Sequence, residues 1–247
     1  MHAYVINLQR RPDRREAIQA QLSPLNIEVS WVCAIDGSAT EFLQKHEQDL
    51  KRTSIFPNEY ACYLSHIAAW NALVMGPHPY ALILEDDALI APDFSEVIAQ
   101  LPALLDVTPV IRLGALQKQV GHSIAKIRPH HRLLLPTKNL SGMQGYVLSK
   151  HGAQSLIDHF SSINEPVDTS LDRYWQKSLP IAGISPVVVL HDRESPSDIS
   201  GGGRKNTSRS HHFLPRIWHS IQKHFNITLM LGRVHFRRRQ KQSPLAR

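Results

Sequence analysis

The chain has 247 residues, of which 42% are hydrophobic and 20% charged, and its formal net charge is +7. This length suits one large domain or a domain with an appendage, and the composition is that of an ordinary globular protein. No run approaches the roughly 18 apolar residues of a membrane span, and the first residues lack the long apolar core of a signal peptide, so we expect a cytoplasmic protein.

Strand-like and helix-like patterns alternate along most of the chain. Pro12 suits the first turn of a helix that runs to about Leu22, and Asn58 is a suitable cap for a helix over residues 59–75. Strands that alternate with helices predict an α/β sandwich around a mostly parallel sheet. The predicted strands are residues 3–8, 28–35, 80–84, 110–114, 131–135, 145–149 and 184–192. The other predicted helices begin near Phe94, at Lys150 and at Pro166.

Cysteine and charge are distributed unevenly. Cys33 and Cys62 lie far apart without a CxxC pair, so we expect buried free thiols and no zinc site built on cysteine. Residues 199–247 contain eleven Lys and Arg and no Asp or Glu, a charge of +11. Residues 1–198 contain seventeen basic and twenty-one acidic residues, a charge of −4. The body of the chain is therefore mildly acidic and its tail strongly basic.

The tail has a pattern of its own. Residues 195–212 are rich in glycine and serine, which is typical of a flexible linker. Beyond them a basic helix is expected with its apolar side chains on one face. We therefore expect a folded domain over residues 1–198 and a flexible basic tail over residues 199–247 that contains a short amphipathic helix. The apolar face of that helix consists of Phe213, Leu214, Ile217, Trp218, Ile221 and Phe225.

A basic amphipathic helix is typical of segments that lie on an anionic membrane surface. The tail has no recognisable nucleic-acid-binding motif, so no nucleic acid partner is expected. The interpretation that we prefer is peripheral attachment to the inner face of the cytoplasmic membrane. The alternative is a solvated, disordered tail.

Three adjacent acids, Glu85, Asp86 and Asp87, follow an apolar strand. Because three carboxylates repel one another and resist burial, we expect them at the open carboxyl edge of the sheet, where α/β proteins bind ligands. A divalent cation with a preference for oxygen ligands would offset their repulsion. The alternative is a solvated loop between a strand and a helix.

A second cluster lies where the first strand meets the first helix. Asn7 is followed by Arg10, Arg11, Arg14 and Arg15. Guanidinium groups at a helix N-terminus suit a phosphate or a uracil nucleotide. The alternative is a solvated basic face of the helix.

Polar residues also interrupt apolar segments further along the chain. Ser65 and His66 interrupt the helix over residues 59–75, and a lone histidine there is more often a core residue than a catalyst. Gly142 and Gly145 permit close approach of the backbone.

Five segments occur in a characteristic order: "YVINLQRRPDRR", "NEYACYLSHIAAW", "ALILEDDALI", "GYVLSKHGAQSL" and "PVDTSLD". Together they resemble the motif series of glycosyltransferase family 25, which includes bacterial lipopolysaccharide-core and lipooligosaccharide galactosyltransferases and collagen galactosyltransferase domains. The resemblance covers roughly residues 2–198, and "LSHIAAW" followed by "ILEDD" is its most specific part. It departs at Ala61, where members commonly have glycine, and we interpret this as a change in packing.

The resemblance implies a GT-A-like Rossmann-type αβα sandwich that transfers a hexose from a UDP-sugar, usually UDP-galactose, with inversion. In such enzymes a D-x-D-type element holds Mn²⁺ or Mg²⁺ against the diphosphate, and Glu85 and Asp87 occupy that place here. Because the motif is not a literal D-x-D, the coordinating pair and the need for metal are left open. His191 is a further candidate ligand. The candidate residues for nucleotide-sugar binding are Asn7, Arg11, Arg14, Asp36, Ser65, His66, Asp86, Gly145 and Tyr146.

An inverting transferase needs one base that takes the proton of the acceptor hydroxyl, and Asp168 is our candidate. The alternative role for Asp168 is that of a helix N-cap, and Asp172 and the acidic triplet are further candidates for the base. The expected partners are a UDP-sugar donor, a lipid-linked oligosaccharide acceptor and the anionic membrane surface. Rival interpretations are a metal-dependent nucleotidyltransferase and a non-catalytic membrane- or nucleic-acid-binding protein that acts through its tail.

Overall fold

The computed structural model describes residues 1–192 and 213–242, except residues 54 and 161, and it describes the side chains of the second range over residues 220–239. Within this part of the chain, eight strands form one sheet in the order β2-β1-β3-β8-β5-β9-β7-β6, and β4 and β10 form a second. The strands of the large sheet are β1 (His2–Asn7), β2 (Glu28–Cys33), β3 (Tyr80–Glu85), β5 (Val110–Arg112), β6 (Gly121–Lys126), β7 (Arg132–Pro136), β8 (Gly145–Ser149) and β9 (Ile181–Ser185). The small sheet consists of β4 (Ala88–Ile90) and β10 (Val189–His191). The helices are α1 (Pro12–Leu22), α2 (Thr40–Lys45), α3 (Glu47–Thr53), α4 (Pro57–Met75), α5 (Phe94–Ile98), α6 (Lys150–Phe160), α7 (Val167–Asp172) and α8 (Phe213–Gln242).

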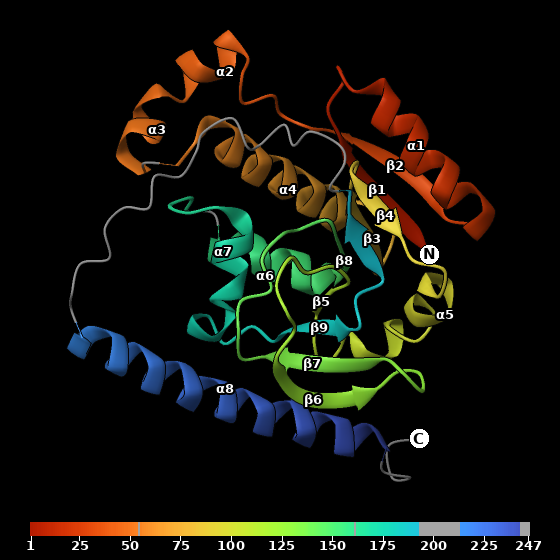
Figure 1. The fold of residues 1–247 in the computed structure, drawn as a ribbon, viewed down its shortest axis with the longest axis vertical. Coiled ribbons are helices and arrows are strands. Elements are labelled where there is room, and N and C mark those ends of the chain that lie inside the picture. The colour runs from red at the N-terminus through yellow and green to blue at the C-terminus, as the bar shows by residue number, and fades with distance from the viewer. Residues whose placement is uncertain (54, 161, 193–212, 243–247) are drawn as a thin grey trace.

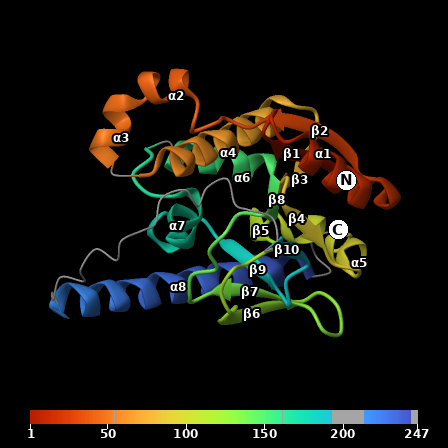
Figure 2. The same ribbon diagram turned by 45° about the horizontal axis from the view of Figure 1, so that its top comes forward.

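In the large sheet only β7 and β8 run against the other strands. β1 is parallel to β2 and β3, and β5 is parallel to β9. β8 is antiparallel to both β3 and β5, and β7 is antiparallel to both β6 and β9. Right-handed connections place α1 and α4 on opposite faces, because β2 and β3 lie on opposite sides of β1. The predicted α/β sandwich with a mostly parallel sheet is confirmed; α4 and α6 lie side by side in Figures 1 and 2.

Burial explains the central strands and helices. Ala81, Leu82, Ile83 and Leu84 of β3 are all fully buried, as predicted for a strand that is covered on both faces. Ile18 and Leu22, four residues apart on α1, are fully buried too. Each such side chain contributes about 1.5–3 kcal/mol when it is removed from water. These residues form one continuous core beneath the carboxyl edge of the sheet.

Several local expectations need correction. The cap of α4 is not Asn58: the helix begins at Pro57, and the backbone N–H of Phe56 donates to Glu59 Oε2 at 3.4 Å. Proline at the first helical position is already set for the helix, so the helix starts two residues earlier than predicted. Cys33 is exposed and not buried, because it ends β2 at the edge of the sheet.

The expected last strand over residues 184–192 is two strands. β9 ends at Ser185, and β10 begins at Val189 beyond Pro186. Proline has no N–H for the ladder and therefore interrupts a central strand. β10 pairs with β4, directly after the acidic triplet, and this pairing brings His191 beside Ala88.

The C-terminal helix is longer than the short helix that the sequence predicts. α8 has 30 residues, and Ile227, Met230 and Val234 are buried where it packs against β6 and the short helix η3 (Tyr174–Gln176). Figure 1 shows α8 running along the β6 side of the molecule. The expected linker and the side chains of residues 213–218 lie outside the described part of the chain. No described helix is long and apolar enough to span a membrane.

Candidate active site

The candidate site lies at the carboxyl ends of β1 and β3. The two strands are parallel, with Ile6 beside Glu85, so both end at the same edge of the sheet. Because β2 and β3 flank β1 on opposite sides, this edge is a topological switch point, where open α/β sheets bind ligands. The acidic triplet therefore lies where the sequence places it.

Two hollows meet at this edge, and we name them the arginine hollow and the Asp168 hollow. Glu85, Asp87 and Cys62 line both hollows and form their boundary. The arginine hollow is also lined by Arg10, Arg14, Asp36, Gly37, Asn58, Ser65, His66 and Asp86, among others. The Asp168 hollow is also lined by Glu59, Leu116, Gly142, Met143, Gln144, Pro166, Val167, Asp168 and His191.

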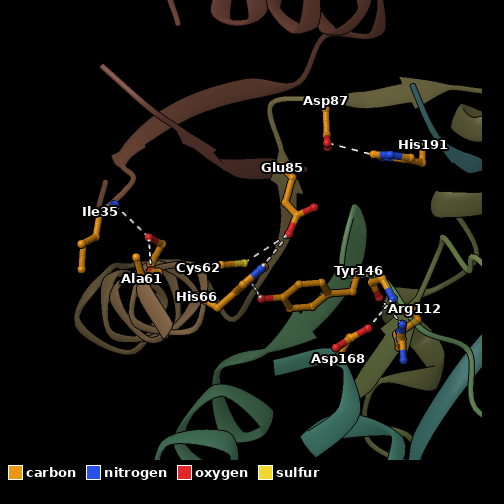
Figure 3. A network of polar contacts seen from close by, with 12 residues as sticks. Ile35, Ala61, Cys62, His66, Glu85, Asp87, Arg112, Tyr146, Asp168 and His191 are labelled. Carbon is orange, nitrogen blue, oxygen red and sulfur yellow. Dashed lines mark hydrogen bonds and ion pairs between the residues drawn. The ribbon is translucent and has the colours of Figure 1, made fainter. Parts of the chain in front are cut away.

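The three acids of the triplet point in different directions. Asp86 turns toward β1 and α1, where Asn7 Nδ2 donates to its Oδ2 at 2.8 Å and Arg14 donates to its Oδ1 at 3.1 Å. The side chains of Arg14 and Asp86 are each 9% exposed, so this ion pair is largely screened from water. Glu85 and Asp87 line both hollows, and Figure 3 shows Glu85 turned toward His66 and Cys62 and Asp87 turned toward His191. Asp86 and Asn7 thus fasten α1 to the strand end.

Asp87 and His191 form the part of the site that fits a cation, while the ligand atoms of Glu85 lie within 4.8 Å of those of Cys62 and His66. Asp87 Oδ2 lies 3.4 Å from His191 Nδ1, while Asp87 Oδ1 and His191 Nδ1 are buried without a hydrogen-bond partner (Figure 3). Burial, followed by the neighbouring charge of Glu85, raises the pKa of Asp87 to about 7. Carboxylate oxygens beside an imidazole nitrogen are a donor set that Mn²⁺ and Mg²⁺ accept. The orphaned atoms and the raised pKa are what a site for a divalent cation requires.

A buried chain of hydrogen bonds holds Glu85. Trp70 Nε1 donates to the Tyr146 hydroxyl at 2.7 Å, that hydroxyl lies 3.0 Å from His66 Nδ1, and His66 Nε2 lies 3.1 Å from Glu85 Oε1. The tyrosine donates its proton to Nδ1, because a carboxylate only accepts and His66 Nε2 must therefore donate to Glu85. His66 and Tyr146 are 1% and 0% exposed. The histidine is thus oriented by a buried tyrosine and positions a carboxylate (Figure 3).

The polar wall of the arginine hollow is built by short-range contacts. Ser65 Oγ accepts the backbone N–H of Ile35 at 2.9 Å and donates to the Ala61 carbonyl at 2.8 Å. Arg10 pairs with Asp36 at 2.6 Å. Burial raises the pKa of Asp36, but hydrogen bonds from Ser38 and Arg10 outweigh it and lower the pKa overall. Asp36 is therefore ionised and directs Arg10 at the rim.

Some candidate residues lie outside both hollows. Arg11 pairs instead with Asp13 at 2.8 Å, and Arg10 lines the arginine hollow in its place. Gly145 lies within the sheet, where an added Cβ would be 2.9 Å from the side chain of Leu84. Tyr146 is behind His66, and Asn7 is behind Asp86. The contacts of Asn7, Arg11, Gly145 and Tyr146 are with other residues of the protein, so these four residues support the structure around the hollows. That they bind the nucleotide sugar stays a prediction.

Gly37 and Asn58 are among the lining residues that the sequence analysis did not assign to the site. A Cβ on Gly37 would lie 2.6 Å from the Cα of Asn58, so this glycine lets the loop after β2 pass directly over the start of α4. Asn58, the second residue of α4, then lines the arginine hollow and does not cap the helix. The signal for Gly37 in the sequence is weak, because a glycine after a strand is common at any turn.

Asp168 lines the Asp168 hollow, and its role as an N-cap is excluded. It is the second residue of α7, whose N-cap is Pro166. Asp168 Oδ2 accepts the backbone N–H of Gly142 at 3.0 Å, and Oδ1 accepts that of Thr169 at 2.7 Å. These two contacts fix the position of both carboxylate oxygens in the hollow.

Asp172, the second candidate for the base, is a structural residue. It is paired with Arg112 at 2.7 Å, and the two side chains are 4% and 2% exposed. It also accepts the backbone N–H groups of Leu140 and Ser141 at 3.1 Å and 3.0 Å. Arg112 in turn donates to the carbonyls of Ser141 and Gly142. This pair fixes the loop that forms one wall of the Asp168 hollow and leaves Asp172 no access to a substrate.

Replacing Arg112 with methionine is expected to lower the free energy of unfolding by about 3–5 kcal/mol, because Asp172 is left as a buried charge without its cation. Urea denaturation followed by circular dichroism measures this change. The double variant Arg112→Met, Asp172→Asn is expected to be more stable than Arg112→Met, because it removes that charge. A loss below about 1 kcal/mol in the single variant would mean that the pair does not hold the loop.

Comparisons with known proteins identify the family of the chain. A family model described as "Glycosyltransferase family 25 (LPS biosynthesis protein)" matches residues 1–171. Lipooligosaccharide biosynthesis protein lic2B of Haemophilus influenzae is 27% identical over 220 residues, which are 83% of this chain and 82% of that protein. Procollagen galactosyltransferase 2 of Homo sapiens is 28% identical over 168 residues, which are 62% of this chain and only 27% of that protein.

Among solved structures, galactosyltransferase LgtC in complex with donor and acceptor sugar analogs aligns with 94% of this chain and 95% of its own, with a TM-score of 0.39 and 10% identity. The family assignment does not depend on that likeness. It follows from the family model, which spans well over half of the sequence and includes the acidic triplet and Asp168. The chain therefore belongs to glycosyltransferase family 25.

Proposed function

We propose that this glycosyltransferase moves galactose from UDP-galactose onto a lipopolysaccharide or lipooligosaccharide core acceptor, with inversion at the anomeric carbon. The observation that supports this most directly is that the arginine hollow and the Asp168 hollow meet at Glu85 and Asp87. UDP in the first hollow would place its sugar over these carboxylates. An acceptor in the second hollow would then face the anomeric carbon from the side opposite UDP.

The residues of the arginine hollow suit the leaving group. Negative charge develops on UDP as the sugar–phosphate bond breaks, and the guanidinium groups of Arg10 and Arg14 lie where they stabilise it. Glu85, Asp87 and His191 would hold Mn²⁺ or Mg²⁺, which when bound supplies further positive charge to the diphosphate. His66 keeps Glu85 in the orientation that this requires.

Asp168 is the proposed base. Its carboxylate lines the acceptor hollow and takes the proton of the attacking hydroxyl as the new glycosidic bond forms. The N–H groups of Gly142 and Thr169 fix its two oxygens, so the base is held in place before the substrate arrives. Arg112 and Asp172 act on the same loop from behind and complete this support.

Donor and acceptor are proposed from the relatives. The human protein named procollagen galactosyltransferase 2 suggests galactose, and the Haemophilus influenzae protein named for lipooligosaccharide biosynthesis suggests a bacterial glycolipid. To test the proposal, the enzyme is incubated with UDP-galactose and a delipidated core oligosaccharide, and released UDP and the lengthened glycan are measured. Pyrophosphate released from a nucleoside triphosphate, with no transfer from any UDP-hexose, would favour a nucleotidyltransferase instead.

We also propose that α8 attaches the enzyme to the inner face of the cytoplasmic membrane. Its buried face packs on the domain, while Ile221, Phe225 and Leu229 recur every four residues on the other side and are 57%, 61% and 48% exposed. Arg233 and Arg237 follow on exposed positions of the same helix. An exposed apolar stripe beside cations is the pattern of interfacial helices, and the acceptor lipid would lie in that membrane.

The variant Ile221→Ser, Phe225→Ser, Leu229→Ser is expected to bind phosphatidylglycerol vesicles at least about tenfold more weakly, because each apolar side chain contributes roughly 1.5 kcal/mol or more when buried. Vesicle sedimentation measures the binding, and turnover on a soluble acceptor is expected to be unchanged. Met75→Ser, at an 81% exposed methionine outside α8, serves as control. Equal binding by the triple variant and the wild type would exclude α8 as the anchor.

A further inference from the structure

A second group of metal-ligating side chains lies at the opposite edge of the sheet. His2 begins β1, Glu28 begins β2, and His78 lies in the turn between α4 and β3. The parallel register places His2 beside Glu28. Asn7 ends β1 five residues later, about 16 Å away at 3.3 Å per residue. This cluster is therefore separate from the candidate active site.

The three side chains converge on one hollow. Their ligand atoms all lie within 4.8 Å of one another, and His2 Nδ1 is 3.5 Å from Glu28 Oε2. All three residues line a hollow together with Met1 and Asn26. Ligand atoms bound to one zinc ion are about 3.4 Å apart, given metal–ligand distances near 2.1 Å in a tetrahedron, so small side-chain shifts complete the site.

His2 shows why an ion fits there. Its side chain is only 6% exposed, and its Nε2 lies 3.0 Å from Ser30 Oγ, while its Nδ1 is buried without a hydrogen-bond partner. With its proton on Nε2 toward Ser30, the lone pair of Nδ1 faces the Glu28 carboxylate. In this tautomer Nδ1 is free to bind a cation in the hollow that Glu28 and His78 also line.

We propose that His2, His78 and Glu28 bind a divalent transition-metal ion, with Zn²⁺ as the best fit. Two imidazoles and one carboxylate form a donor set that zinc takes up with water as the fourth ligand, whereas Mg²⁺ and Ca²⁺ prefer oxygen alone. Ser30 serves as the outer partner that fixes the tautomer of His2. The ring of His78 stacks on that of His2 at 4.1 Å and 13° and turns toward the ion when it binds.

The ion would join three segments of the chain. Within the described residues, no disulfide joins the starts of β1 and β2 and the turn before β3. The cluster contributes one ligand from each of these three segments. An ion that binds only the folded state stabilises it by RT ln(1 + [L]/Kd). Zinc is therefore expected to raise the Tm of the protein whether or not any sugar is transferred.

The test uses the untagged full-length chain, because a histidine tag would itself bind zinc. Calorimetric titration with Zn²⁺ and thermal unfolding with and without Zn²⁺ are compared for the wild type, Glu28→Gln and His78→Asn. We expect both variants to lose one bound equivalent and most of the zinc-dependent rise in Tm. Both positions are at least partly exposed, so the variants are expected to fold, which their Tm in EDTA verifies.

Two control variants locate the equivalent that is lost. His151→Asn, at an exposed histidine of α6, tests surface binding, and His191→Asn tests the candidate active site. Both are expected to retain the equivalent that Glu28→Gln removes. The proposal is overturned if Glu28→Gln and His78→Asn bind zinc like the wild type, or if the wild type binds none below millimolar concentration. Neither result depends on whether the enzyme transfers galactose.

Discussion

Replacing Asp168 with asparagine is expected to lower kcat for galactose transfer about 10³-fold and to leave KM for UDP-galactose unchanged, because the acceptor hydroxyl loses its base while the donor contacts remain. Asparagine has the same shape as aspartate, and its carbonyl oxygen still accepts one of the two backbone N–H groups. The hollow is therefore expected to keep its form. Initial rates with a soluble core oligosaccharide measure both constants.

The control for this prediction is Asp158→Asn, at an exposed aspartate of α6 whose contact is the side chain of Gln154. It is expected to leave both constants at their wild-type values. A decrease in kcat of less than tenfold for Asp168→Asn would show that another group takes the proton. Because Asp172 is buried against Arg112, the remaining candidates would be the carboxylates of the triplet.

Replacing Asp87 with asparagine is expected to weaken Mn²⁺ binding at least about 100-fold and yet to stabilise the metal-free protein above pH 7. The folded-state pKa of Asp87 is raised from 3.8 to about 7, so its charged form is disfavoured in the folded protein. This cost is absent below pH 4, grows as the pH rises from 4 to 7, and is constant above. At about 1.4 kcal/mol per pKa unit it reaches on the order of 4 kcal/mol.

The stabilities are measured by urea denaturation in EDTA at pH 5 and pH 8, and Mn²⁺ binding by calorimetry at pH 8. The neighbouring variant Asp86→Asn is the matched control. It is expected to be destabilised at both pH values, because it weakens the buried ion pair with Arg14. If Asp87→Asn is no more stable than the wild type at pH 8, burial at the triplet does not strain Asp87, and the argument for a cation there fails.

Local sequence patterns were sufficient to predict much of this site. The apolar run of β3 and the acids behind it predict a buried strand with charges at the ligand-binding edge, because only an edge of the sheet accommodates them. Pro12 sets the start of α1 as predicted, whereas α4 starts at Pro57 and not after the predicted cap Asn58. The helix α6 has the bounds Lys150–Phe160, and its start at Lys150 was also predicted from the local sequence pattern.

Partners that are distant in sequence could not be predicted. Arg10 and Arg11 are adjacent and chemically identical, and only the fold decides that Arg10 reaches Asp36 while Arg11 turns to Asp13. The pairing of Arg112 with Asp172 spans 60 positions and removes the second candidate for the base. His66 is oriented by Tyr146, which lies 80 positions away. Such contacts depend on strand order, which no short motif specifies.

The most direct test of the proposed function is to measure binding and slow hydrolysis of a panel of UDP-sugars, with Mn²⁺ and with EDTA, for the wild type and Asp87→Asn. We expect the wild type to bind and hydrolyse UDP-galactose in preference to the other sugars, only with Mn²⁺, and the folded Asp87→Asn variant to do neither. If the wild type binds no UDP-sugar under either condition, the meeting of the two hollows at Glu85 and Asp87 is not a donor site.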